Sequence, residues 1–118
     1  MTEHLPPLPP VVAGFLTAQG ARDTAAALTA FTPDAVVTDD GTAHRGPAEI
    51  ARWLDATTAE YSWSSWITGT EHLGAGSPGT ERWTSTHHLE GDFPGGVVDL
   101  THRWTLCSGR IAELTIAP

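Results

Sequence analysis

Mostly apolar residues that would share one helical face recur in three stretches of the first sixty residues, which predicts three helices. The positions are Val11, Val12, Phe15 and Leu16 in the first stretch, Thr24, Ala27, Leu28 and Phe31 in the second, and Ile50, Trp53, Leu54 and Thr57 in the third. The first helix should stop near Gly20. The second, over 21–31, should end before Pro33, because the residue preceding a proline avoids helical angles. The third opens at Gly46-Pro47, since proline suits the first helical position.

From Tyr61 onward the pattern changes to an alternation of polar and apolar residues, which is typical of β-strands. Strands are predicted over 62–73, 80–90, 97–107 and 110–116, with turns rich in Gly, Pro and Asp between them. A shorter hairpin, 35–38 with 42–45, turns at Asp40-Gly41. We therefore predict an α+β fold in which a curved antiparallel sheet packs on three N-terminal helices and leaves a cone-shaped cavity between the two layers.

Two runs of the sequence resemble a known group of proteins. The run "FTPDAVVTDDGTAHRGPAEIARWL" (31–54) resembles a segment of the SnoaL-like and ketosteroid-isomerase-like members of the nuclear transport factor 2-like superfamily, and "HLEGDFPGGVVDLTHRWTLCSGRIAELTIAP" (88–118) resembles the last strands of SnoaL-like proteins. The resemblance implies one cone-shaped, cystatin-like domain over 10–118, and the Pro-rich residues 1–9 are expected to form a flexible arm. It implies no single activity, because the superfamily includes isomerases, polyketide cyclases, dehydratases, epoxide hydrolases and proteins that catalyse nothing known.

Asp39 is the first candidate catalytic residue, because the resemblance aligns it with the general base of ketosteroid isomerase. A carboxylate at the rim of an apolar cavity can move a proton between two carbon atoms of a bound molecule. The alternative is that Asp39 and Asp40 serve only the hairpin turn, where Asp-Gly is common for backbone reasons.

His102 is a polar residue in an otherwise apolar row of the predicted strand 97–107. The row consists of Val98, Leu100, His102, Trp104 and Leu106. Burying an imidazole costs free energy unless its nitrogens find partners. We expect His102 either to line the cavity, bonded to an acid or a ligand, or to lie in the core, bonded to a backbone carbonyl. In strand 80–90, His87 shares the more apolar face with Trp83 and is the next candidate.

Asp99 presents a conflict between alternation and resemblance. Ketosteroid isomerase carries a protonated acid of its oxyanion hole on this strand, and Asp99 matches it only if the following hairpin is about two residues longer here. Simple alternation points Asp99 away from the face that holds His102, and a β-bulge near Gly96 or Val98 would reverse this. The first helix also lacks a tyrosine to complete such an oxyanion hole, since Tyr61 is the chain's only tyrosine.

Aromatic residues are the candidate walls of the cavity. We expect Trp53, Trp83 and Trp104, with either Trp63 or Trp66, to converge there and to suit a hydrophobic, polycyclic or aromatic ligand; the alternative is that these rings simply fill the core. The candidate ligand-binding residues are Trp53, Trp83, Trp104, Leu100, His44 and Tyr61.

Charge and composition narrow the possible partners. The six basic residues, all Arg, stand against fourteen acidic ones, a net charge of −8, which argues against nucleic acids and anionic membranes as partners. A single cysteine, Cys107, excludes an internal disulfide, and the histidines have no metal-binding spacing. We expect no metal and no cofactor. With no apolar run that could span a bilayer and no signal-peptide pattern, a cytoplasmic location is expected.

The sequence thus predicts a small-molecule-binding SnoaL-like domain that acts as a cofactor-free acid–base enzyme on a hydrophobic carbonyl compound, as an isomerase, cyclase or dehydratase. Asp39 would be the base, and His102 or His87 the acid, orienting group or oxyanion donor. The alternatives are a non-catalytic protein that binds a hydrophobic ligand and an accessory dimerisation protein. A homodimer through the outer face of the sheet is expected, because that face carries Thr, Arg and either Trp63 or Trp66.

Overall fold

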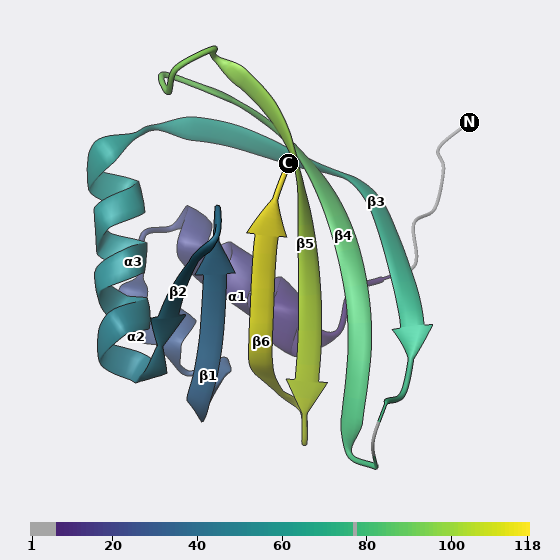
Figure 1. Ribbon diagram of the computed structural model, residues 1–118. Coiled ribbons are helices and arrows are strands. Elements are labelled where there is room, and N and C mark those ends of the chain that lie inside the picture. The colour runs from purple at the N-terminus through teal and green to yellow at the C-terminus, as the bar shows by residue number, and fades with distance from the viewer. Residues whose placement is uncertain (1–6, 77) are drawn as a thin grey trace.

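A computed structural model describes residues 7–76 and 78–118, and within them the chain forms three helices and six strands. These are α1 (Pro10–Gly20), α2 (Thr24–Leu28), β1 (Phe31–Asp39), β2 (Thr42–Arg45), α3 (Gly46–Glu60), β3 (Trp63–Gly74), β4 (Thr80–Gly91), β5 (Val97–Cys107) and β6 (Arg110–Ala117). The strands form one curved sheet in the order β2-β1-β6-β5-β4-β3. Helix α1 crosses behind this sheet and α3 stands beside β1 and β2 (Figure 1). The predicted α+β class is confirmed.

Residues 1–6 of the predicted arm lie outside the described residues, and Leu8, just before α1, packs against the core. None of the described helices is both long and apolar enough to cross a membrane.

The predicted second helix is too long, and the first strand correspondingly starts earlier. Helix α2 ends at Leu28, and Phe31 already pairs with Ile111 of β6. The core explains this, because the Phe31 ring packs edge-to-face on Phe15 with ring centroids 5.2 Å apart. Pro33 is tolerated within β1 because the pairing with β6 is interrupted between Phe31 and Val36, where no ladder hydrogen bond needs its missing N–H.

The sheet is antiparallel except where β1 pairs with β6. These two strands run parallel, with Val37 opposite Leu114 and Asp39 opposite Ile116. Strand β2, helix α3 and the long strands β3–β5 lie between them in the sequence, which provides the crossover that a parallel pair requires. The pairing brings the end of β1 beside the end of β6 in the middle of the sheet.

The core lies between the concave face of the sheet and the helices. Its large enclosed members include Trp104 and Leu114 from the sheet, Phe15 from α1 and Ile50 from α3. The Phe15 and Trp104 rings contact edge-to-face at 5.8 Å. Burial of each such side chain contributes about 1.5–3 kcal/mol. This packing holds α1 and α3 over one part of the sheet and leaves the neighbouring part of the concave face uncovered by helix.

Candidate functional site

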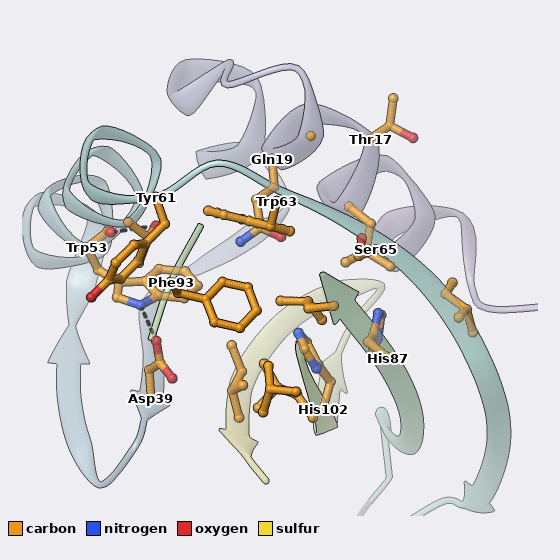
Figure 2. Close-up of a pocket in the computed structure, with 18 residues that line it drawn as sticks. Thr17, Gln19, Asp39, Trp53, Tyr61, Trp63, Ser65, His87, Phe93 and His102 are labelled. Atoms are coloured by element: carbon orange, nitrogen blue, oxygen red, sulfur yellow. Dashed lines mark hydrogen bonds between the residues drawn. The ribbon is translucent and has the colours of Figure 1, made fainter. Parts of the chain in front are cut away.

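A cavity of about 500 Å³ lies between the concave face of the sheet, α1, α3 and the loop that joins β4 to β5 (Figure 2). Its apolar and aromatic lining residues are Leu16, Trp53, Trp63, Ile67, Leu89, Phe93, Val98, Leu100 and Ile116. Its polar lining residues are Thr17, Gln19, Asp39, Thr57, Tyr61, Ser65, His87 and His102. A volume of this order accommodates a small organic molecule.

Asp39 enters the cavity from the last position of β1. The turn that follows it places Asp40 and Gly41 at φ values of 50° and 81°, which is the geometry of a tight hairpin. The Asp39 carboxylate accepts a hydrogen bond from the Trp53 indole through Oδ2, with Nε1 and Oδ2 2.9 Å apart. Trp53 belongs to α3, so a helix–strand contact fixes the orientation of the carboxylate (Figure 2).

His87 and His102 form a pair of imidazoles at the other end of the cavity (Figure 2). They come from the adjacent strands β4 and β5, and their ring centroids are 4.0 Å apart. His102 is only 6% exposed. Its Nδ1 atom is enclosed and has no hydrogen-bond partner among residues 7–76 and 78–118, whereas the Nε2 atom of His87 lies 2.7 Å from the Ser85 hydroxyl.

Burial keeps both imidazoles uncharged at neutral pH. It lowers the pKa of His102, with a further contribution from the charge on His87, to about 3. Burial also lowers the pKa of His87. Loss of hydration in the apolar wall is the cause that both shifts share, and repulsion from His87, whose ring centroid is 4.0 Å away, adds to the shift of His102. At pH 7 the pair therefore offers neutral N–H donors and bare nitrogen acceptors.

Six predicted site residues line the cavity and four do not. Those in the lining are Asp39, His87, His102, Trp53, Leu100 and Tyr61. Those outside it are Asp99, Trp83, Trp104 and His44.

Asp99 follows simple alternation and lies on the outer face of the sheet. It pairs with His88 of β4, and its Oδ1 is 2.7 Å from the His88 Nδ1. Its side chain is 79% exposed. The register of β4 and β5 is unbroken from Val97 to Cys107, so no bulge turns Asp99 inward. This removes Asp99 from the cavity site.

The other three residues support the cavity from outside its lining. Trp83 and Trp104 are paired across β4 and β5 and are both buried, so they fill the core as the alternative interpretation held. His44 lies on the edge strand β2, where its ring faces that of Trp53 with centroids 6.0 Å apart.

Phe93 and Trp63 complete the cavity wall. The pattern 92–96, rich in Gly and Pro, indicated only a turn, yet Phe93 folds back so that its ring meets Tyr61 at 6.3 Å. The sequence signal that could have indicated this role was an aromatic residue, Phe93, inside an otherwise polar turn. The ambiguity between Trp63 and Trp66 is also resolved, since Trp63 lines the cavity and Trp66 is 52% exposed on the outer face.

Among the described residues, no three or more His, Cys, Asp or Glu side chains are grouped so that they could hold a metal ion. The cavity's polar chemistry therefore comes from one carboxylate, two neutral imidazoles, hydroxyls and an amide.

Comparison with known proteins agrees with this architecture. The family model of the SnoaL-like domain matches residues 12–114. The structure of a candidate polyketide cyclase from Sinorhizobium meliloti superposes with a TM-score of 0.81 at 34% sequence identity and covers 93% of this chain and 95% of that chain. That of a candidate ketosteroid isomerase from Shewanella frigidimarina superposes with a TM-score of 0.78 at 17% identity, covering 91% of each chain, and at this identity the similarity concerns the fold. No curated protein matches the sequence. The chain belongs to the SnoaL-like domain family.

Proposed function

We propose that the protein binds a small, largely apolar carbonyl compound in this cavity and moves a proton on it without a cofactor, as an isomerase, cyclase or dehydratase does. The observation that carries the proposal is that one carboxylate and two neutral imidazoles line a single, mostly apolar cavity. Titratable groups with shifted pKa values that face a cavity are typical of acid–base sites, whereas a purely binding cavity needs only apolar walls.

Asp39 acts as the base in this proposal. Its carboxylate takes a proton from the carbon next to the carbonyl group, and the electron pair of that C–H bond moves onto the carbonyl oxygen to form an enolate. Return of the proton to another carbon regenerates the carboxylate and completes an isomerisation. Trp53 holds one carboxylate oxygen, Oδ2, which leaves Oδ1 for the substrate.

The two histidines act as neutral hydrogen-bond donors toward the enolate oxygen. An imidazole whose pKa is lowered to about 3 cannot serve as a cationic acid near pH 7, but its N–H can still stabilise negative charge that develops on oxygen. The apolar walls around the site strengthen such a bond, because little water competes for it.

The comparisons support the type of reaction and no particular substrate. The Sinorhizobium meliloti protein, described as a candidate polyketide cyclase, is 34% identical over nearly the whole chain. Cyclisation and isomerisation share the first step, abstraction of a proton next to a carbonyl group, so the same residues serve either outcome.

The test follows proton exchange instead of a complete reaction. The protein is incubated in D₂O with a panel of small aromatic and polycyclic ketones, and proton NMR follows deuterium uptake next to the carbonyl group. We expect at least one ketone to exchange faster with the protein than without it. Asp39→Asn should reduce the excess rate at least about a hundredfold, because general bases contribute on the order of 10²–10⁴.

Fluorescence separates catalysis from binding. Trp53 and Trp63 line the cavity, so a bound aromatic ketone should quench tryptophan emission. Asp40→Asn is the matched control, since Asp40 is exposed in the turn and should leave both readouts unchanged. A ketone that quenches the emission but does not exchange, with Asp39→Asn equally inert, would favour the non-catalytic binding protein instead.

We also propose that the protein is a homodimer through the outer face of its sheet. Trp66, 52% exposed, lies there over His88 with ring centroids 5.8 Å apart, beside Asp99. An exposed indole among polar groups suits an isologous interface. Light scattering should give twice the 12.5 kDa chain mass, and Trp66→Glu should give the monomer. A wild-type mass of one chain at high concentration would refute the dimer.

A further inference from the structure

Ser85 connects the cavity to the core through two hydrogen bonds. The Trp104 indole donates to the Ser85 hydroxyl oxygen, with Nε1 and Oγ 2.9 Å apart. The same Oγ lies 2.7 Å from Nε2 of His87. Ser85 and Trp104 are each 1% exposed, so water does not compete for either bond.

The position of the hydroxyl proton follows from counting donors and acceptors. A serine hydroxyl has one proton and two lone pairs, and an indole N–H can only donate. Trp104 therefore occupies one lone pair of Ser85. If Nε2 of His87 carried a proton, it would occupy the second lone pair, and the Ser85 proton would have no acceptor among the described residues. A buried donor without an acceptor is strongly disfavoured.

We propose that Ser85 is a positioning residue that holds His87 in the tautomer protonated on Nδ1, so that this end of the cavity offers an N–H donor and receives an oxygen acceptor of the ligand. In this arrangement the Ser85 hydroxyl donates to Nε2, and every polar group of the Trp104–Ser85–His87 chain is satisfied. The part that concerns the ligand rests on the proposed function, whereas the tautomer does not.

The free nitrogen of His87 is accessible to a ligand. His87 lines the cavity, and among the described residues the one enclosed side-chain nitrogen or oxygen without a partner is Nδ1 of His102. Nδ1 of His87 also makes no hydrogen bond within the described chain, yet it is not among the enclosed atoms. It is therefore accessible, and because His87 lines the cavity, it is open to the cavity. A carbonyl, enolate or carboxylate oxygen could accept from it, whereas an ammonium group could not.

The tautomer can be measured on the wild-type protein without any ligand. In a two-bond ¹H–¹⁵N NMR spectrum at pH 7.5, a protonated imidazole nitrogen and a bare one have well-separated ¹⁵N shifts, and His87→Gln identifies the signals that belong to His87. We expect Nδ1 of His87 to be protonated and Nε2 to be bare, with an excess of roughly tenfold or more over the other tautomer. The reverse assignment in the wild type would overturn the proposal.

Two variants separate positioning from mere packing. Ser85→Ala removes the hydroxyl, so the His87 signals should shift toward a mixture of tautomers. Trp104→Phe removes the other hydrogen bond but leaves the Ser85 proton with Nε2 as its acceptor, so the wild-type tautomer should persist. Unchanged His87 shifts in Ser85→Ala would overturn the proposal. These spectra contain no ketone, so the tautomer can be established even if no ketone exchanges. Equally, ketone exchange can be observed even if His87 has the other tautomer.

Discussion

Replacing His102 by glutamine is expected to remove an acid-sensitive part of the stability of the fold. Glutamine has a polar amide of comparable reach but no proton to gain. In the wild type, His102 is 6% exposed, and burial together with the charge on His87 lowers its pKa to about 3. In the unfolded chain the same side chain has a pKa near 6.5.

The sign follows from which state binds the proton. Between pH 6.5 and about 3 the unfolded chain binds a proton at His102 that the folded chain does not, so acid favours unfolding. Above pH 6.5 both states are neutral and the effect vanishes. Within the window the slope approaches about 1.4 kcal/mol per pH unit, which amounts to about 2 kcal/mol between pH 7 and pH 5.

Urea unfolding of wild type and His102→Gln at pH 7, 6 and 5 measures this term directly. Contributions of the carboxylates are common to both proteins and cancel in the difference between their unfolding free energies. That difference should change by about 2 kcal/mol from pH 7 to pH 5, in favour of the variant. The control is His88→Gln. Hydrogen bonds to Glu90 and Asp99 raise the pKa of His88, so lowering the pH from 7 to 5 should change the difference in unfolding free energy in favour of the wild type over this variant. Parallel curves for wild type and His102→Gln would refute the reasoning.

Four further substitutions test other features of the fold and site. Trp53→Phe removes the N–H that orients Asp39 and should lower ketone exchange about tenfold and stability by about 1 kcal/mol, the second by urea unfolding. Gly91→Ala should destabilise the fold by about 1–3 kcal/mol, because a Cβ there would overlap backbone at the start of β3. Gly14→Ala should stabilise it by about 0.5–1 kcal/mol, because a Cβ at this position of α1 meets open space and alanine favours a helix. Urea unfolding measures both changes. Asp23→Ala should cost about 1 kcal/mol by removing the cap of α2, measurable as a lower Tm.

Hydrophobic periodicity was sufficient to predict most of the fold. Strand alternation put His102 and Leu100 on the concave face and Asp99 outside, which is where the structure has them. The hairpin at Asp40-Gly41 was predictable because this dipeptide favours positive φ at both positions. These features depend on residues close in sequence, and local rules describe them well.

Features that depend on long-range contacts were not predictable in the same way. The helical spacing up to Phe31 was real, but an aromatic contact with Phe15 and pairing with Ile111 outweighed it. Trp83 shares the inward face with His87, yet Trp83 is buried in the core and His87 lines the cavity, a difference that alternation does not assign. A sequence pattern assigns a face of a strand but not the element that covers it.

The sheet separates two sets of histidines that differ in sequence position by as little as one residue. His87 points into the apolar interior, where burial lowers its pKa, while His88 points outward, where Glu90 and Asp99 raise its pKa. The same residue type therefore tends to be a neutral hydrogen-bonding group on one face and a cation on the other near pH 6.5. Strand alternation produces this division, because the single step from His87 to His88 exchanges the apolar cavity wall for the carboxylates of Glu90 and Asp99. The uncharged face is the one that can bind an apolar molecule, and protonation of a histidine within it costs stability, as expected for His102.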